Sequence, residues 1–600
     1  YMNTETMTPS PHSFHIPVMG LAFTVDSPVK VARFGISSVM SIIEDRLLEM
    51  MRNHYYSVLG EPYRPIKSDE PEYRARRITD YLNLVNRIVE RQVASMKASD
   101  FTPGSDLVRY FELLPDDNEA RQQYERMLQT DNELEKHFLQ RLLKKQLMPG
   151  CLDVNIMTKV DKNNSDANGN PIEDGSDAVA ALRGYANSDL KNSSVIFSAG
   201  MNPRVFNYLE KTTAFEARAW GLFDKKVVIK VSDYRSALIQ GKLLAKKGIW
   251  VSEFRIESGL NCGGHAFATD GYLLGPILEE FKTKRVELSE TLHGLYQTAL
   301  ENKGKKTFKQ PHPIRITVQG GIGTNEEDAF LRQYYQADST GWGTPFLLCP
   351  EATTVDHETL GLLAAADQSQ LVLSKNSPLG IRFHYLKGTS SAKEKLNRIM
   401  AGKPGSPCTE KHLATNTEFT SEPICTASHK YQRLKIEQLK ALNLPGDEYE
   451  RQVEEVLAKE CLCVGLSNAA SINYGKTMVD NLHSVTICPG PNIAYFNKVV
   501  TLKEMTDHIY GRVNLLEGVH RPHMFINELT LYINYLREQV ELAGHDEKKV
   551  TANAKFAANL LEGIAYYRSI SDQIEHTSVF LHELQEGEAA IDRLVGVSAD

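Results

Sequence analysis

Cysteine is scarce in this chain, with eight residues among 600, and basic residues are outnumbered by acidic ones. Sparse cysteine excludes a disulfide-stapled scaffold and indicates a reducing, cytoplasmic compartment. The formal net charge of −8 argues against a nucleic-acid binder with a broad basic face. No apolar run reaches the roughly 18 residues of a membrane span, and residues 1–15 lack the pattern of a signal peptide. We therefore expect neither a nucleic-acid partner nor a membrane association.

What the sequence does contain is an alternation of short β-rich runs with helical patterns between residues 14 and 350. This alternation is typical of a parallel sheet with helical crossovers. Eight such units predict the α/β class and a (β/α)₈ TIM barrel, with an open doubly wound sheet as the alternative. The expected strands are His15–Phe23, Gly35–Ile42, Leu152–Val160, Ser194–Ala199, Lys226–Val231, Val251–Glu257, Ile314–Gln319 and Thr340–Leu348.

The chain is too long for a minimal barrel, so additional segments are expected. We assign residues 14–43 and 150–400 to the barrel and 44–149 to a helical insertion with long amphipathic helices, such as Glu72–Ala98 and Asn118–Leu147. Residues 401–500 form a cysteine-containing segment that packs on the barrel, and 501–600 a C-terminal helical extension. These helical additions are candidate surfaces for a homo-oligomer.

Two glycine-rich segments accompany the last two expected strands. Gln319-Gly320-Gly321-Ile322-Gly323-Thr324 follows one strand directly and leads into a helix, and Gly341-Trp342-Gly343-Thr344 lies within the other. Glycines let the backbone approach a ligand closely, and free N–H groups before a helix attract phosphate. In a β/α barrel, phosphate sites are frequently built from the loops of the seventh and eighth strands. The pair therefore predicts a phosphate-bearing ligand.

Two further residues near the expected barrel mouth have side chains suited to proton transfer or to holding an anion. His265 follows Gly263 and Gly264 after the sixth expected strand, and imidazole is suited to proton transfer near neutral pH. The alternative for His265 is a loop histidine that only hydrogen-bonds to backbone. Lys230 interrupts an apolar strand, so it should be paired or point to the barrel mouth, where it could hold an anionic substrate or a reduced flavin.

The motifs VVIKVS (Val227–Ser232), ESGLNCGGHAF (Glu257–Phe267), VQGGIGT (Val318–Thr324) and GWGTPFLL (Gly341–Leu348) occur in this order. In this order they resemble the nitronate monooxygenase, or 2-nitropropane dioxygenase, family. Its members are FMN-dependent TIM barrels related to flavin enoyl-reductases. The resemblance covers residues 14–350 well and 375–500 loosely. Where the family pattern has Glu-Ala before Gly-Gly-His, this chain has Asn261-Cys262, and Pro345 replaces an arginine.

The resemblance implies that FMN is the cofactor and that His265 is the catalytic base near the flavin. It also implies that Gly320, Gly321, Gly343 and Thr344 hold the phosphate, that Lys230 faces the ring and that Asn155 lines the pocket. The full set of candidate cofactor-binding residues is Met19, Gly20, Asn155, Lys230, Glu257, Gly263, Gly264, Gly320, Gly321, Gly323, Gly341, Trp342, Gly343 and Thr344.

These expectations describe an FMN-dependent oxidoreductase that oxidises a small acidic C–H substrate, with O₂ or NAD(P)H as the possible second reactant. One alternative is an NAD(P)H-dependent reductase of enoyl thioesters or similar double bonds, and another is a non-catalytic flavin-binding scaffold. No metal site is expected, because the late cysteines Cys408, Cys425, Cys461, Cys463 and Cys488 lack Cys-x-x-Cys spacing. They are interpreted as reduced thiols between the barrel and the C-terminal helices.

Overall fold

The computed structural model describes residues 10–198, 200–263 and 270–596. Eight parallel strands close into a barrel in the order β1-β10-β9-β8-β7-β4-β3-β2. The predicted TIM-type barrel is therefore confirmed, and the open doubly wound sheet is excluded. The barrel strands are β1 (Phe14–Ile16), β2 (Ser37–Ser41), β3 (Leu152–Met157), β4 (Ser193–Ser198), β7 (Lys225–Val231), β8 (Val251–Glu257), β9 (Arg315–Gln319) and β10 (Ser339–Gly341).

The first and last strands are shorter than the sequence pattern suggests. Strand β1 ends at Ile16 because Pro17 follows, and proline has no N–H to donate to a neighbouring strand. Strand β10 ends at Gly341, and a 3₁₀ helix, η2 (Thr344–Leu348), begins three residues later with a proline in its first turn. Ala199, the expected end of the fourth strand, lies outside the described residues.

Alternate residues of each barrel strand face the interior and form layers. Near the N-terminal ends, Arg255 forms an ion pair with Glu253, Nε to Oε2 at 2.5 Å. Val39, Ile196 and Val228 make a small apolar cluster above them. Polar side chains follow at the C-terminal ends of the strands, where TIM barrels carry their chemistry: Ser41, Asn155, Ser198, Lys230, Glu257 and Gln319.

Helices surround the barrel and bury apolar faces on it. Helix α3 contacts α2 and α7, and α9 contacts α10, so the first half of the predicted insertion packs beside the barrel helix α7. The helices between the strands are α1 (Ser27–Val31), α2 (Asp45–Leu59), α3 (Tyr73–Ala98), α7 (Asp177–Ala186), α8 (Pro203–Leu209), α9 (Tyr234–Lys246), α10 (Leu274–Asn302) and α11 (Asn325–Gln333).

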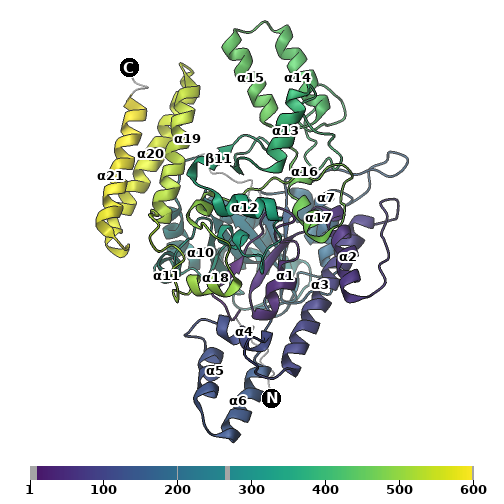
Figure 1. Cartoon of the computed structure of the whole chain (residues 1–600), viewed down its shortest axis with the longest axis vertical. Helices are drawn as coiled ribbons and strands as arrows, with labels where there is room; N and C mark the ends of the chain where they lie inside the picture. Colours follow the sequence, from purple (N-terminus) through teal and green to yellow (C-terminus); the bar gives the residue numbers. More distant parts are fainter. Residues whose placement is uncertain (1–9, 199, 264–269, 597–600) are drawn as a thin grey trace.

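The remaining helices of the insertion, α4 (Asp106–Leu113), α5 (Glu119–Gln129) and α6 (Glu133–Lys145), lie at the lower end of the molecule in Figure 1. The sequence pattern predicts one helix over Asn118–Leu147, but the structure has two. The chain breaks after Gln129 because the Asn132 side chain accepts hydrogen bonds from the N–H groups of Leu134 and Glu135 and so starts a new helix.

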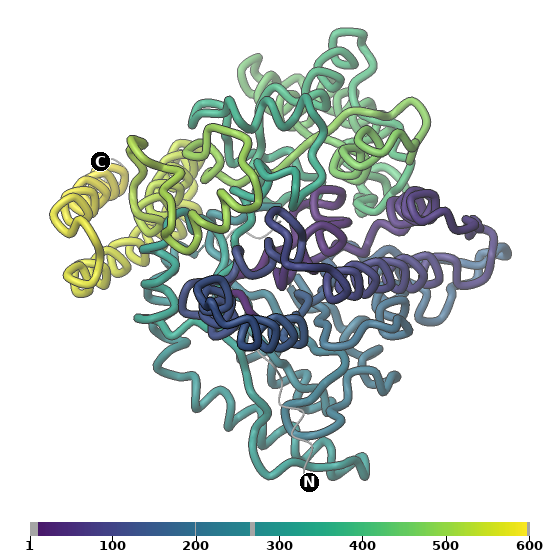
Figure 2. The backbone as a smooth tube through the Cα atoms, turned by 60° about the horizontal axis from the view of Figure 1, so that its bottom comes forward, coloured from purple at the N-terminus to yellow at the C-terminus, as the bar shows by residue number. Residues whose placement is uncertain are grey.

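The C-terminal part of the chain forms two groups of helices on the barrel. Helices α13 (Ser390–Met400), α14 (His429–Ala441) and α15 (Gly446–Ala458) lie at the top of Figure 1. Helices α19 (Met524–Ala543), α20 (Glu547–Ser569) and α21 (Thr577–Gly596) pack against one another at one side, as both views show (Figures 1 and 2). The short elements between them are α12 (His357–Ala365), α16 (Leu462–Gly465), α17 (Asn468–Tyr474), α18 (Leu502–Ile509) and the β11–β12 hairpin (Leu371–Ser374, Phe383–Leu386).

Among the described residues, no helix combines the length and apolar character that crossing a membrane requires.

Candidate active site

Two adjoining cavities lie at the C-terminal mouth of the barrel. The first, which we call the mouth cavity, has a volume of about 70 Å³ and is lined by residues that include Gly20, Asn155, Lys230 and Gly263. The second, the loop cavity, has a volume of about 10 Å³. Its lining includes Glu257, Gly320, Gly321, Gly341, Gly343 and Thr344. Lys230 and Glu257 form a buried ion pair between them, with Nζ 3.1 Å from Oε2.

Hydrogen bonds fix most of the polar side chains at this mouth. Glu257 accepts a bond from Gln319 Nε2 at 2.8 Å and from Asn261 Nδ2 at 3.2 Å. Asn155 donates from Nδ2 to Ser198 Oγ at 3.1 Å, but its Oδ1 is buried and has no partner among the described residues. Because buried polar atoms are nearly always paired, this oxygen marks a place for a ligand or water.

The loop after β9 is held from its outer side by the C-terminal part of the chain. The carbonyl of Gly321 accepts a hydrogen bond from Arg521 Nη2 at 2.7 Å, and that of Ile322 accepts one from Asn492 Nδ2 at 3.0 Å. The carbonyl of Gly323 lies 2.7 Å from His508 Nε2. Three successive carbonyls are thereby satisfied by side chains more than a hundred residues away in the sequence.

Two N–H groups of this loop, and two more in the segment after β10, have no partner. In the part of the chain that the structure describes, the amides of Gly321 and Ile322 donate to no protein group, and neither do those of Gly343 and Thr344. These four residues line the loop cavity. We call their N–H groups the amide cradle. Several backbone N–H groups around one concavity make a site for an anion.

Arg521 is the centre of the outer support. Its side chain is 4% exposed and pairs with Glu327, Nη1 to Oε2 at 2.8 Å. Glu327 also accepts the N–H of Gly323 at 2.9 Å and that of Met524 at 2.7 Å. Burial opposes ionisation of Glu327, but the adjacent Arg521 charge holds the pKa of this carboxyl below its usual value. Local sequence patterns gave no signal for Arg521, because it lies 200 residues from Gly321.

Most of the predicted cofactor residues meet at the two cavities, and some do not. Gly323 turns outward, since a Cβ there would lie 2.6 Å from the Arg521 guanidinium. Trp342 is fully buried away from the cavities, with its ring edge-on to His508. Met19 is buried beside Gly343, where its Sδ would meet a Cβ at 3.4 Å. Gly264 and His265 lie outside the described residues.

The free space at the mouth is small because the loop after β8 lies close to the segment that follows strand β1. Gly263 donates to Cys488 O at 3.1 Å, and a Cβ on Gly263 would lie 2.5 Å from the backbone nitrogen of Gly20. Cys488 is buried and the neighbouring Cys262 is half-buried. Loss of solvent around the thiols raises the pKa of Cys262 well above its usual value and that of Cys488 to about 12. Both cysteines are therefore neutral thiols at physiological pH.

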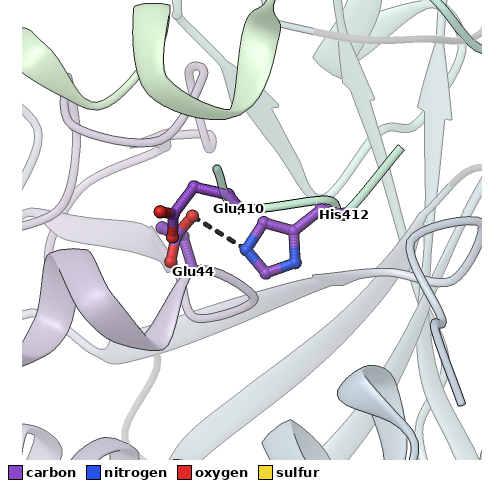
Figure 3. A group of neighbouring side chains, drawn as sticks. All are labelled: Glu44, Glu410 and His412. Atoms are coloured by element: carbon purple, nitrogen blue, oxygen red, sulfur yellow. Dashed lines mark hydrogen bonds and ion pairs between the residues drawn. The ribbon is translucent and has the colours of Figure 1, made fainter. Parts of the chain in front are cut away.

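The far wall of the mouth cavity comes from two distant segments. Glu44 lies directly before helix α2. His412, Leu413 and Cys463, which line the same cavity, lie within residues 401–500. His412 Nε2 lies 2.8 Å from Glu44 Oε2, and Figure 3 shows Glu410 beside this pair. Glu44 and His412 are 368 residues apart, so no local sequence pattern predicts that they meet.

All eight cysteines are free thiols.

Neither a known protein family nor a curated protein matches this chain. Among solved structures, the enoyl reductase domain of MlnA from the macrolactin biosynthesis cluster of Bacillus amyloliquefaciens is similar over 69% of this chain and 89% of its own, at 14% identity and a TM-score of 0.32. Nitroalkane oxidase from Streptomyces ansochromogenes is similar over 66% of this chain and 85% of its own, at 10% identity and a TM-score of 0.26. Similarity at this level assigns neither a family nor an activity.

Proposed function

We propose that this chain is a flavin-dependent oxidoreductase that binds FMN at the mouth of its barrel. The observation that carries the proposal is the amide cradle, whose four unpaired N–H groups surround one concavity beside the ends of β9 and β10. Such a cradle suits one terminal phosphate. The sequence motifs at the same strands agree with this position.

The N–H groups of the amide cradle fit the phosphate of FMN. The cavities at the barrel mouth, however, must become larger to hold the whole molecule. Gly321, Ile322, Gly343 and Thr344 would hold the phosphate, and the mouth cavity between Gly20 and Lys230 would take the ring. Ligand sites typically have volumes of about 300–1,000 Å³, and the two cavities are far smaller. Binding therefore requires the Asn261–Gly263 segment to move away from Gly20.

When bound, FMN supplies the redox chemistry, and the protein supplies orientation and proton transfer. Lys230 would place a positive charge beside the ring, and its partner Glu257 keeps the side chain in position. The proposed substrate is a small molecule with an acidic C–H bond. His265, which lies outside the described residues, is the proposed base, and general-base help is typically worth about 10²–10⁴-fold in rate.

The proposal is tested by titrating the purified protein with FMN and following flavin fluorescence. Substituting Gly343→Val should weaken FMN binding at least about tenfold, or 1.4 kcal/mol, because the added side chain enters the loop cavity. A Cβ at Gly343 meets its neighbours only at 3.4–3.5 Å, so the fold should tolerate it. Gly361→Val is the matched control, since a Cβ at Gly361 in helix α12 meets nothing within 4 Å.

Failure of the parent protein to bind FMN at about 100 µM, a free energy of roughly −5.5 kcal/mol, would refute the proposal. Equal affinity in the Gly343→Val variant would refute the placement of the phosphate. For a protein that does bind FMN, anaerobic mixing with NADPH then distinguishes the two enzyme classes, because a double-bond reductase requires rapid bleaching of the flavin absorbance.

A further inference from the structure

The rim of the mouth cavity holds a second cluster of side chains that the proposed function does not use. Glu44, Glu410 and His412 each present one ligand atom, and these atoms all lie within 4.8 Å of one another (Figure 3). Their side chains are only 2%, 7% and 7% exposed, respectively. One imidazole nitrogen and two carboxylates are a common ligand set for divalent transition metals.

The orientation of His412 matches that of a metal ligand. Its Nδ1 lies 3.1 Å from Asp177 Oδ2, which leaves Nε2 directed at Glu44. In metal sites the other nitrogen of a ligating histidine is held by a carboxylate, a backbone carbonyl or a water, and Asp177 would fill this role here. Asp177 is itself held by Arg74, at 3.2 Å, so the support is buried and charged.

Positive charge is distributed unequally over the two glutamates. Although burial opposes a charge on His412, the carboxylates of Glu44 and Asp177 raise its pKa to about 10, so Glu44 faces a cation. Glu410 pairs through Oε1 with Arg46, whose side chain is 47% exposed, and its Oε2 accepts no hydrogen bond from the described residues. Two buried carboxylates this close repel each other unless a cation lies beside them. In the metal-free protein the His412 imidazolium supplies this charge to Glu44, and a bound metal ion would take over that role. Bonds of about 2.0–2.2 Å from one ion place its ligand atoms roughly 3–4 Å apart, so small side-chain movements would complete the site.

A separate observation points to a ligand in the same cavity. Asn155 lines it together with Glu44 and His412, is 4% exposed, and its Oδ1 has no partner among the described residues. We propose that Glu44, Glu410 and His412 bind a divalent first-row transition-metal ion whose open coordination positions face the mouth cavity. Three protein ligands leave room for water or a substrate oxygen, as in catalytic metal sites.

The open positions define the class of ligand. A water molecule or an oxyanion, such as a carboxylate, would bind the ion from the cavity side, and Asn155 Oδ1 would accept a hydrogen bond from bound water. The sequence-based expectation of no metal rested on cysteine spacing alone. It could not consider this set, because Glu44 and His412 are 368 residues apart.

The test is metal binding by the purified full-length protein, read by elemental analysis and by titration with Zn²⁺ and Mn²⁺ after chelation. Co²⁺ serves as a visible probe of the ligand set. We expect one equivalent of metal, and we expect Asp177→Asn to weaken the affinity about 10–100-fold and Glu410→Gln at least as much. Glu418→Gln, in the same segment but paired with Lys435 instead, should bind like the parent protein.

Thermal unfolding of each metal-free variant confirms that it is folded, and His412→Gln replaces any variant that is not. Absence of stoichiometric binding of either ion would overturn the proposal, since the cluster would then be held together by a shared proton. Binding that Glu410→Gln leaves unchanged would overturn it as well. Metal content of the flavin-free protein and flavin fluorescence are separate readouts, so failure of this proposal and failure of the proposed function give different results.

Discussion

A buried glutamate in helix α19 makes the loop beside the proposed site sensitive to pH. Glu528 is 2% exposed, and its Oε1 accepts the N–H of Leu274 at 2.8 Å. Its Oε2 lies 3.5 Å from the N–H of Gly259. The same carboxyl thus contacts both ends of the chain segment between β8 and α10. Burial raises the pKa of Glu528 to about 7.

The sign of the effect follows from linkage. Between the pKa values of the unfolded and folded states, 4.5 and about 7, the native protein binds more protons than the unfolded chain. The free energy of unfolding therefore falls as pH rises through this window. A shift of this size lowers it by about 2.5 kcal/mol between pH 5 and pH 8. The Glu528→Gln variant lacks this pH-dependent loss of stability, and its side-chain oxygen can still accept the N–H of Leu274.

The assay is urea unfolding of both proteins at pH 5 and pH 8, with hydrogen exchange of peptides on either side of the loop to localise the change. We expect the free energy of unfolding of the variant, relative to that of the parent protein, to be about 2.5 kcal/mol higher at pH 8 than at pH 5. Glu562→Gln, an exposed position in the neighbouring helix α20, is the control and should give parallel behaviour. A constant difference between parent protein and Glu528→Gln at both pH values would refute the reasoning.

Of two further predictions, one concerns the support of the barrel mouth and the other concerns glycines elsewhere in the fold. Arg521→Met leaves Glu327 buried without its partner and should lower the free energy of unfolding by about 3–5 kcal/mol, which urea denaturation measures; the double change with Glu327→Gln should recover part of the loss. In a second case, Gly150→Ala places a Cβ 2.0 Å from the carbonyl oxygen of Ile36 and should destabilise the barrel strongly. Gly294→Ala in helix α10, where a Cβ meets nothing within 4 Å, should stabilise by roughly 0.5–1 kcal/mol. Similar melting temperatures for the two alanine variants would contradict this.

The barrel could be predicted from the sequence because its signals are local. Each strand carries its own short β-rich run, and parallel strands buried on both faces show it clearly. The errors fall where single residues decide the local structure. Pro17 directly follows the short strand β1, and Pro345 lies in the first turn of the 3₁₀ helix that occupies part of the expected last strand. Asn132 likewise divides an amphipathic pattern that reads as one helix.

The candidate site was only partly predictable, for a physical reason. Glycines on the β9 and β10 loops predict that the backbone can approach a ligand closely, because the conformational freedom of glycine is a local property. The residues that complete the site interact through space, and neither Arg521 nor His412 has a local pattern that marks it. Trp342 lies beside two cradle residues in sequence, but its side chain is buried against His508 instead of lining a cavity.

The C-terminal additions are part of the site as well as a cover for it. A peptide unit that offers its N–H to a ligand still needs a partner for its carbonyl, because buried polar groups left unpaired are costly. Arg521, Asn492 and His508 provide those partners for three successive carbonyls of the β9 loop. Without them the loop could satisfy its carbonyls only by turning, and the N–H groups would turn with them. The helices beyond the barrel therefore fix which face of the loop a ligand meets.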